Sequence, residues 1–412
     1  TAQETPKNLQ LRIPADRNWI FDAEHPARFA LELNSPKPGI AGELQIDIRT
    51  DFGEPITSRK TAYAFTVDSA TVKGGFRSRA NAEIGVLSPG FYQAYFIAGA
   101  DTLRHIFFGY EPERIVSEPD GKADLKKFWR KTLAELKGVA PDYRMTPLAD
   151  ASTPERAVYE VQMQSLEGET LRGYWAVPED GRKHPAVVVY QGYGATTWIP
   201  KPTDYPGWCV LVIPPRGQGL NKTWNRFGEW ISYGLDSPWH YYYRGAFADT
   251  VRSIDFVFAQ SGFDGRNLFA TGISQGGGLT LVAASLDRRV RAAAPIVPFL
   301  GDFPDYFRLV PWLVFEGAEK QHLTREAVFN LLSYFDLKNL CRRIECPVLM
   351  GFGLQDVITP PHTNFAAYNP IRAPKRWICY PESGHHAAYD NMDIWIAEST
   401  RFFRTHMKTS NR

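Results

Sequence analysis

Alternating apolar and polar positions mark the first part of this chain. The alternation runs through residues 44–48 and 91–97 and is typical of strands with one buried face. Turn signals separate these segments at short spacing, at residues 37–39, 51–53, 73–75 and 88–90. Short alternating strands with regular turns predict that residues 1–115 form an immunoglobulin-like β-sandwich.

The pattern changes after residue 115. Apolar runs at residues 185–190 and 347–353 are typical of parallel strands buried on both faces, and residues 376–381 are interpreted as the last strand. Helix-like segments at residues 127–136 and 393–406 alternate with such runs. Residues 116–412 are therefore predicted to form an α/β domain, with a mostly parallel sheet flanked by helices.

A serine motif lies between an apolar segment at residues 267–271 and a helix-like segment at residues 279–285. Residues 272–276 read Gly-Ile-Ser-Gln-Gly, and Gly-x-Ser-x-Gly between strand and helix is the nucleophile elbow of α/β-hydrolases. Glycines flank the serine because side chains there would collide in so tight a turn. Taken alone, the motif fits a simple glycine-rich turn equally well, so the prediction of Ser274 as nucleophile needs partners.

An acid and a histidine follow the serine in the order that this fold requires. Asp356 comes just after the run 347–353, and His385 follows the glycine beyond the run 376–381. Asp356 read singly could cap a helix, and His362 and His386 are rival histidines. We favour His385 because it directly follows the glycine after the last strand.

These residues define a nucleophilic mechanism. His385 would take the proton of Ser274 during attack on an acyl carbon, and Asp356 would orient the imidazole. The oxyanion needs two backbone donors. One is the N–H of Gln275, and the other is expected in the loop after the run 185–190, with the N–H of Tyr193 as the best candidate.

The chain from about residue 120 to residue 407 resembles the acetyl xylan esterase and cephalosporin C deacetylase family, carbohydrate esterase family seven. The resemblance implies the triad Ser274, Asp356 and His385 and an oxyanion hole at Tyr193 and Gln275. It also implies removal of acetyl groups from sugar hydroxyls without a metal or organic cofactor. The stretches that carry it are residues 127–136, Arg-Gly-Gln-Gly at 216–219, Tyr-Tyr-Tyr-Arg at 241–244, 272–277, 298–300, 332–336 and 365–369.

Four further residues are candidates for supporting roles. Arg216 and Gln218 are predicted to hold the scaffold of the site, because a guanidinium can bond several oxygens in one fixed fork; a surface arginine beside a glycine turn is the alternative. Trp198 and Trp239 are tentative substrate contacts, because sugar rings pack on aromatic faces. Packing in the core or an interface is the better interpretation for any single tryptophan.

Composition limits the classes of partner. The net charge is +2 with no long charged run, so nothing indicates binding to nucleic acid or to a membrane surface. Four cysteines, at positions 209, 341, 346 and 379, are predicted to be free thiols, with 341 and 346 as the pair to check. The first residues resemble the start of an exported protein after signal-peptide removal, which predicts a secreted or periplasmic location.

Three functions remain open at this point. The first is a serine esterase that deacetylates xylan, xylo-oligosaccharides or related substrates such as cephalosporin C. The second is a serine hydrolase of another acyl class, acting on another carbohydrate ester or a peptide. The third is a carbohydrate-binding protein without catalysis. The N-terminal domain is expected to serve packing or assembly, including a homo-oligomer, rather than sugar binding.

Overall fold

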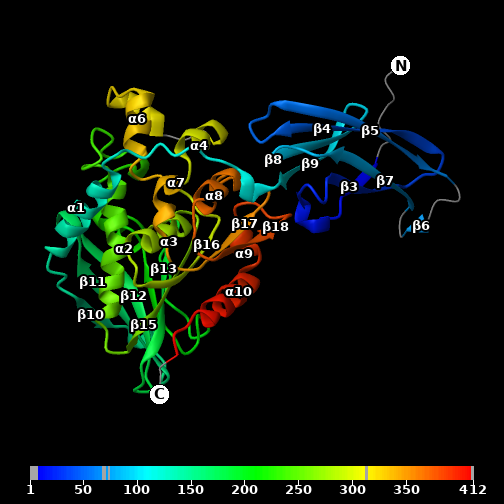
Figure 1. The fold of residues 1–412 in the computed structure, drawn as a ribbon. Coiled ribbons are helices and arrows are strands. Elements are labelled where there is room, and N and C mark those ends of the chain that lie inside the picture. The colour runs from blue at the N-terminus through cyan, green and yellow to red at the C-terminus, as the bar shows by residue number, and fades with distance from the viewer. Residues whose placement is uncertain (1–7, 67–70, 73–74, 311–313, 410–412) are drawn as a thin grey trace.

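The computed structural model describes residues 8–66, 71–72, 75–310 and 314–409. Two sheets form the N-terminal part, in the orders β1-β3-β7-β6 and β2-β9-β8-β4-β5 (Figure 1). Their strands are β1 (Gln10–Arg12), β2 (Ile20–Phe21), β3 (Ala27–Ser35), β4 (Ile40–Thr50), β5 (Pro55–Phe65), β6 (Thr71–Val72), β7 (Gly75–Gly85), β8 (Gly90–Ala98) and β9 (Asp101–Tyr110).

The two N-terminal sheets pack face to face through alternate side chains. Phe29 on β3 lies with its ring centroid 5.5 Å from that of Phe96 on β8 and 5.2 Å from that of Phe108 on β9. The strands expected at residues 44–48 and 91–97 are confirmed as parts of β4 and β8. Of the expected turns, residues 73–74 lie outside the described residues. An immunoglobulin-like topology stays a prediction.

A nine-stranded sheet organises the rest of the chain, in the order β10-β11-β12-β14-β13-β15-β16-β17-β18. The six strands from β14 to β18 in this order are parallel, and the first three are antiparallel to their neighbours. The strands are β10 (Arg144–Pro147), β11 (Arg156–Gln164), β12 (Thr170–Pro178), β13 (His184–Tyr190), β14 (Cys209–Ile213), β15 (Phe263–Ile273), β16 (Val290–Ile296), β17 (Val348–Gly353) and β18 (Lys375–Tyr380).

Helices cover both faces of this sheet (Figure 1). Val188 on β13 belongs to a core shared with α1, α2 and α3, whereas its neighbours Val187 and Val189 belong to a core shared with α10. A continuous apolar run therefore serves both faces, as expected for parallel strands. The helices are α1 (Leu125–Lys137), α2 (Tyr242–Phe258), α3 (Gln275–Leu286), α4 (Phe303–Leu309), α5 (Val314–Lys320), α6 (Arg325–Leu332), α7 (Leu337–Leu340), α8 (Pro361–Tyr368), α9 (Ala387–Asp390) and α10 (Met392–Thr405).

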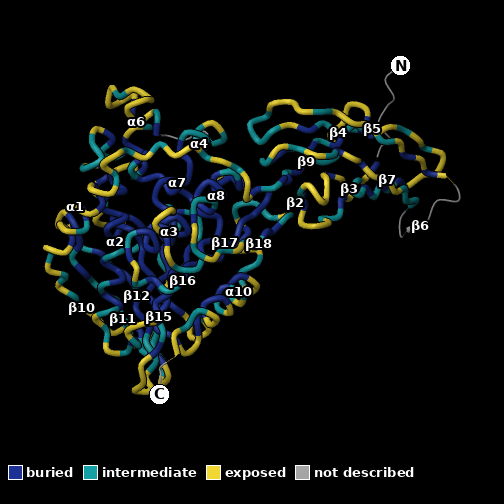
Figure 2. Tube along the Cα trace, in the orientation of Figure 1, coloured by how far each residue is buried: buried dark blue, intermediate teal, exposed yellow. Residues whose placement is uncertain are grey.

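The N-terminal sheets are joined to the large sheet by a common apolar core. Phe91 on β8 lies 5.5 Å from Phe365 on α8 and 6.4 Å from Phe352 on β17, measured between ring centroids. The side-chain nitrogen of Asn369 donates hydrogen bonds to the carbonyls of Pro112 and Ile115, in the segment that connects the two parts. Figure 2 shows the buried segments continuing from β8 and β9 toward β17 and β18.

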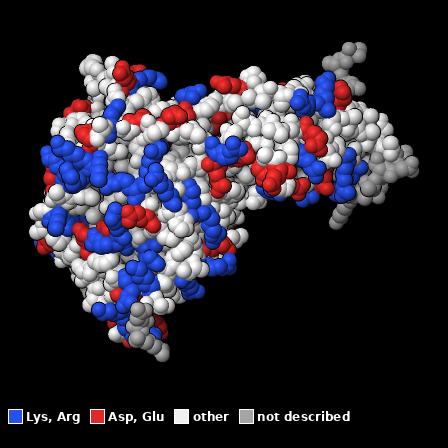
Figure 3. All heavy atoms as spheres, viewed as in Figure 1, with Lys and Arg blue, Asp and Glu red and all other residues white. Residues whose placement is uncertain are grey.

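Charges, cysteines and helix lengths can be compared with what the composition predicted. Both signs of charge are spread over the face in Figure 3, with lysines and arginines gathered around α1. The four cysteines are free thiols, as predicted, and burial raises the pKa of each of them. Within the described residues, every helix is too short or too polar to cross a membrane.

Candidate active site

The predicted site residues gather at one edge of the large sheet. The parallel strands β13, β15, β17 and β18 end there, because parallel strands present their carboxyl ends on the same side. The segment that holds Tyr193 follows β13, Ser274 follows β15, Asp356 follows β17, and His385 follows β18. The fold therefore brings to one edge segments that are far apart in the sequence.

Ser274 occupies the turn between β15 and α3 with φ +60° and ψ −120°. Residues other than glycine rarely adopt this backbone conformation with positive φ, which costs of order 1–3 kcal/mol. A Cβ at Gly276 would lie 2.1 Å from the carbonyl oxygen of Tyr190, and one at Gly272 would lie 2.4 Å from that of Gly276. Both glycines of the motif are thus required because other backbone segments approach them closely. In the nucleophile elbow, such a turn exposes the serine at the end of the strand.

Asp356 and His385 form a direct pair. Asp356 Oδ2 lies 2.9 Å from His385 Nδ1, and Asp356 is 2% exposed. Asp356 Oδ1 accepts hydrogen bonds from the backbone N–H groups of Ile358 and Thr359 at 2.8 and 2.9 Å. These bonds fix the orientation of the carboxylate. When His385 donates its Nδ1–H to this carboxylate, its other ring nitrogen, Nε2, carries no proton and can accept one.

Thr359 links the acid to the serine turn. Its Oγ1 lies 2.9 Å from Asp356 Oδ2 and 3.1 Å from both His385 Nδ1 and the Val297 carbonyl. The preceding carbonyl, that of Ile296, accepts a hydrogen bond from the Ser274 N–H at 3.1 Å. The end of β16 and the residue after it therefore contact both segments: Ile296 bonds the serine turn, and Val297 bonds Thr359 of the loop that carries the acid.

Among the hydrogen bonds of the described residues, none joins Ser274 to His385. Such bonds are often long in enzymes without substrate and tighten in the complex. The rival histidines have other partners. His362 lies between Asp51 and Asp305 at 2.8 and 3.0 Å, and His386 is exposed, with its ring beside Tyr389.

A buried pair of side-chain amides joins the two expected oxyanion segments. The Nε2 of Gln218 donates to Gln275 Oε1 at 3.2 Å, and the Nε2 of Gln275 donates to Gln218 Oε1 at 3.1 Å. Gln218 Oε1 also accepts from the backbone N–H of Gly194 at 3.0 Å, next to Tyr193. Tyr243 donates to Gln275 Oε1 at 2.8 Å. Gln218 thus holds the loop after β13 against the start of α3.

Tyr193 anchors the same loop on its outer side. Its hydroxyl donates to the carboxylate of Glu229 and accepts from the backbone N–H of Ile231 at 3.3 Å. Its ring packs on Trp230 at a centroid distance of 5.0 Å. Burial and the carboxylate of Glu229 raise the pKa of the Tyr193 phenol, which keeps it a neutral donor.

The family model for acetyl xylan esterases matches residues 110–402. The chain belongs to the acetyl xylan esterase family. It is therefore a carboxylic ester hydrolase, and its large sheet is that of an α/β-hydrolase. The interpretation as a carbohydrate-binding protein without catalysis is wrong.

Relatives extend the similarity in two directions. The acetyl esterase Axe7A of Xylanibacter ruminicola is 28% identical over 397 residues, which cover 92% of this chain and 87% of the relative. This match extends into the N-terminal sheets, outside the family model. A solved acetyl xylan esterase of Paenibacillus sp. R4 has a TM-score of 0.64 with 27% identity over 72% of this chain and 98% of that one. Acetyl xylan esterase 1 of Thermoanaerobacterium sp. JW/SL YS485 has a TM-score of 0.61 with 29% identity over 68% of this chain and 95% of that one.

Arg216 lies beneath the site of this esterase and is 0% exposed. Its guanidinium bonds both oxygens of Asp249 at 2.9 and 2.7 Å, Glu167 at 3.1 Å and the Leu166 carbonyl at 3.1 Å. Burial alone lowers the pKa of Arg216, but Asp249 and Glu167 raise it above its ordinary value. Arg216 touches none of the three proposed catalytic side chains among the described contacts, and its role in holding the segment of Gln218 stays a prediction.

The two tryptophans named as substrate contacts differ in surroundings. Trp198 is 40% exposed on the loop that holds Tyr193. Trp239 packs against Phe128 on α1, at a centroid distance of 4.5 Å, and Lys131 and Arg244 lie over its ring at 4.7 and 5.0 Å. Trp239 therefore has a packing role, and contact of either tryptophan with substrate stays a prediction.

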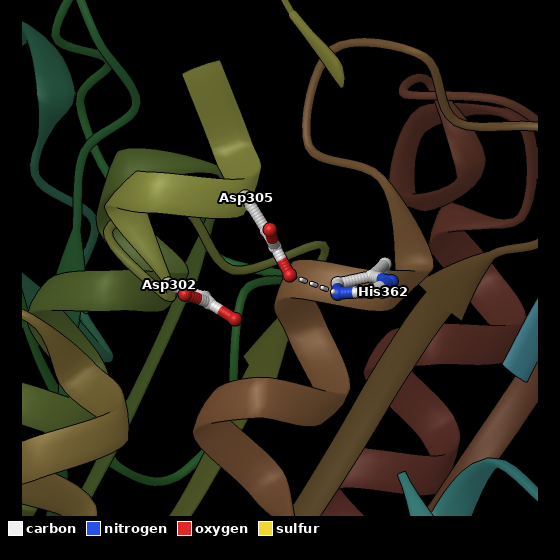
Figure 4. A group of neighbouring side chains, drawn as sticks. All are labelled: Asp302, Asp305 and His362. Carbon is white, nitrogen blue, oxygen red and sulfur yellow. Dashed lines mark hydrogen bonds and ion pairs between the residues drawn. The ribbon is translucent and has the colours of Figure 1, made fainter. Parts of the chain in front are cut away.

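A cluster of Asp302, Asp305 and His362 beside the esterase site has a spacing that could suit a cation, with one ligand atom of each within 4.8 Å of the others. Figure 4 shows Asp305 on α4 pointing at His362 at the start of α8. Its charges are already matched within the protein, because Lys338 Nζ lies 2.9 Å from Asp302 and carboxylates contact both nitrogens of His362. The cluster is better described as a network of ion pairs.

Two contacts around the site were not predicted from the sequence. Thr359, three residues after Asp356, has the spacing of a local Asp–Thr turn, which was a usable signal. The contact between Asp51 and His362 joins residues 311 positions apart. No local pattern in a single sequence indicates such a pair.

Proposed function

We propose that the chain is a serine esterase that removes O-acetyl groups from acetylated carbohydrates, such as xylan or xylo-oligosaccharides, through an acyl-enzyme. The observation that carries this proposal is the strained turn at Ser274 beside the Asp356–His385 pair, held 2.9 Å apart. Membership of the acetyl xylan esterase family supports the acetyl group and the carbohydrate. Cephalosporin C, which also carries an acetyl ester, is a second substrate under this proposal.

The reaction would proceed in two halves. Ser274 Oγ attacks the acetyl carbonyl carbon while His385 Nε2 takes its proton, and the N–H groups of Tyr193 and Gln275 stabilise the oxyanion. The carbon–oxygen bond to the sugar breaks as His385 returns the proton to the sugar oxygen. Water then attacks the acetyl-serine with His385 again acting as base, which releases acetate and restores Ser274.

The proposal also includes the arrangement around the catalytic part. Residues 1–115 would form an immunoglobulin-like β-sandwich domain and residues 116–412 the catalytic domain, which the two face-to-face sheets and the family match from residue 110 support. Trp198 would contact the sugar. A secreted or periplasmic location and a homo-oligomer belong to the same proposal.

The test of the substrate class compares acyl groups on one protein. We expect rapid acetate release from acetylated xylo-oligosaccharides and from cephalosporin C, and at least ~100-fold lower kcat/KM on matched esters of longer acyl chains. Acetate is measured directly by a coupled assay, with deacetylated oligosaccharide as the blank. Equal rates on acetyl and longer acyl esters would contradict the acetyl specificity while leaving the serine mechanism standing.

Gln218→Met is expected to lower kcat about 10–100-fold with a smaller change in KM, since oxyanion donors contribute chiefly in the transition state. Methionine keeps the length of the side chain but loses the amide that bonds Gly194 and Gln275. The matched control is Gln260→Met, because Gln260 donates to the Phe256 carbonyl at the end of α2, outside the site. Equal kinetics for the two variants would exclude Gln218 from positioning the oxyanion hole.

A further inference from the structure

The loop that carries Asp356 runs from the end of β17 to the start of α8. On its inner side, Asp356 and Thr359 of this loop contact His385, as described above. Its outer side faces the N-terminal sheets, which contact both ends of the loop. The contacts include hydrogen bonds between partly buried groups, unlike those of a domain tethered only by a linker.

Gln355, directly before Asp356, pairs with the edge of an N-terminal strand. Its Oε1 accepts from the N–H of Phe107 at 2.8 Å, and its Nε2 donates to the Phe107 carbonyl at 3.0 Å. Strand β2 pairs with β9 only at Gly109 and Tyr110, which leaves the edge of β9 open at Phe107. The side-chain amide therefore continues the hydrogen bonding that β2 begins, and it ties the catalytic loop to β9.

Asp51 holds the far end of the same loop. It lies in the turn between β4 and β5, and its Oδ2 contacts Nδ1 of His362 at 2.8 Å, with Asp305 at 3.0 Å on the other ring nitrogen. The side chains of Asp51 and His362 are 8% and 12% exposed. Burial lowers the pKa of His362, but the two carboxylates raise it to about 10. His362 is therefore an imidazolium at neutral pH, bridging the N-terminal sheets and α4.

A small cavity marks the meeting point of these groups. It has a volume of about 60 Å³, and Asp51, Phe107, Asp356 and His362 all line it. The ring of Phe52, the residue after Asp51, lies 5.3 Å from the ring of His362, measured between centroids. The guanidinium of Arg308 lies over the same Phe52 ring, 3.9 Å from its centroid. Residues of the N-terminal sheets and the proposed catalytic acid thus line the same small cavity.

We propose that the N-terminal sheets position the catalytic acid: Asp51, through His362, and Phe107, through Gln355, hold the loop of Asp356 in its working geometry. Asp51 is then a positioning residue for ester hydrolysis, although it lies on a different sheet from the triad. The inference rests on the proposed function, because it requires Asp356 to be the acid of the triad. It assigns to the N-terminal part a role in turnover beyond packing or assembly.

Asp51→Asn is expected to lower kcat about 10-fold or more, because a displacement of a catalytic group by about 1 Å costs up to 10²-fold. KM should change less than about two-fold, since Asp51 acts through the acid and not through bound substrate. Gln355→Met removes the two bonds to Phe107, together with a bond to the Pro381 carbonyl at 2.8 Å, and should have the same effect. The control Asp22→Asn removes the charge from an acid–histidine contact of 2.9 Å elsewhere in the N-terminal part and should leave kcat unchanged.

A double-mutant cycle with Asp356→Asn decides whether Asp51 acts through the acid. Activity is measured on an activated acetate ester, and folding of each variant is checked by circular dichroism and thermal unfolding. We expect Asp356→Asn to lower kcat by ~10⁴-fold and Asp51→Asn to have less than about a two-fold effect in that background. If the two losses multiply, or if Asp51→Asn and Gln355→Met leave kcat unchanged, the inference is overturned while the triad stands. If Asp356→Asn itself retains near-normal kcat, the proposed triad fails and the inference fails with it.

Discussion

Replacing Ser274 by alanine is expected to lower kcat for acetate release by about 10⁵- to 10⁶-fold, because the acyl-enzyme cannot form without the hydroxyl. Residual hydrolysis would come from direct attack of water on the bound ester, with the oxyanion donors stabilising the transition state. Stability should stay nearly unchanged, since alanine and serine both carry a Cβ and meet the same strain at φ +60°. The measurement is steady-state acetate release from acetylated xylo-oligosaccharides, together with mass spectrometry of the protein after reaction with a fluorophosphonate.

A serine on the same helix gives the matched control. Ser285, near the end of α3, donates its hydroxyl to the Leu281 carbonyl at 2.7 Å and, within the described part of the chain, makes no hydrogen bond to the site. Ser285→Ala should keep full activity and should accept the fluorophosphonate at Ser274. If Ser274→Ala keeps more than about 1% of the activity, the nucleophile of this esterase lies elsewhere, because no binding effect alone compensates for a lost nucleophile.

The parts of the fold that local pattern determines could be predicted from the sequence. Residues 185–190 and 347–353 are continuous apolar runs, and both lie within buried parallel strands or at their edge, β13 and β17. Gly-x-Ser-x-Gly predicted a sharp turn at Ser274, and the structure has that turn. A Cβ at Gly276 would collide with β13, which explains the glycine at that position of the motif. In each case the physical cause lies within a few residues of the pattern.

What could not be predicted depends on contacts between distant segments. The sequence indicated Asp356 and His385 by their order after strands, but gave no sign that Gln355 pairs with Phe107 or that Asp51 meets His362. His362 was a rival for the catalytic base because its residue type fits, and the structure places a carboxylate against each of its ring nitrogens. Side-chain chemistry suggests a role, whereas the fold decides the partner.

Trp239 illustrates the same limit for aromatic residues. Its place in a tryptophan-rich segment favoured a sugar contact, but its ring lies against Phe128 with Lys131 and Arg244 over it. Large aromatic side chains stabilise both cores and sugar sites by burying apolar area, so composition alone cannot distinguish the two. Exposure distinguishes them better, and Trp198 is the more exposed candidate.

Arg216→Met is expected to lower the free energy of unfolding by about 3–5 kcal/mol, the usual cost of removing one partner of a buried ion pair. Asp249 would remain, 5% exposed, with Ser165 as its remaining hydrogen-bond donor at 2.6 Å. An uncompensated carboxylate in that place destabilises the native state more than the lost bonds themselves. The measurement is urea unfolding followed by tryptophan fluorescence at neutral pH.

The charge left behind, and not the loss of arginine as such, should cause this destabilisation. The double variant Arg216→Met, Asp249→Leu removes both charges and should recover part of the loss, because apolar replacement of a whole buried pair is often tolerated. Arg12→Met is the surface control: Arg12 is 71% exposed and lies 3.0 Å from Glu32, so its loss should cost no more than about 1 kcal/mol. A loss for Arg216→Met as small as that for Arg12→Met would mean that the guanidinium does not hold the scaffold beneath Gln218, and the position of that amide would then need another cause.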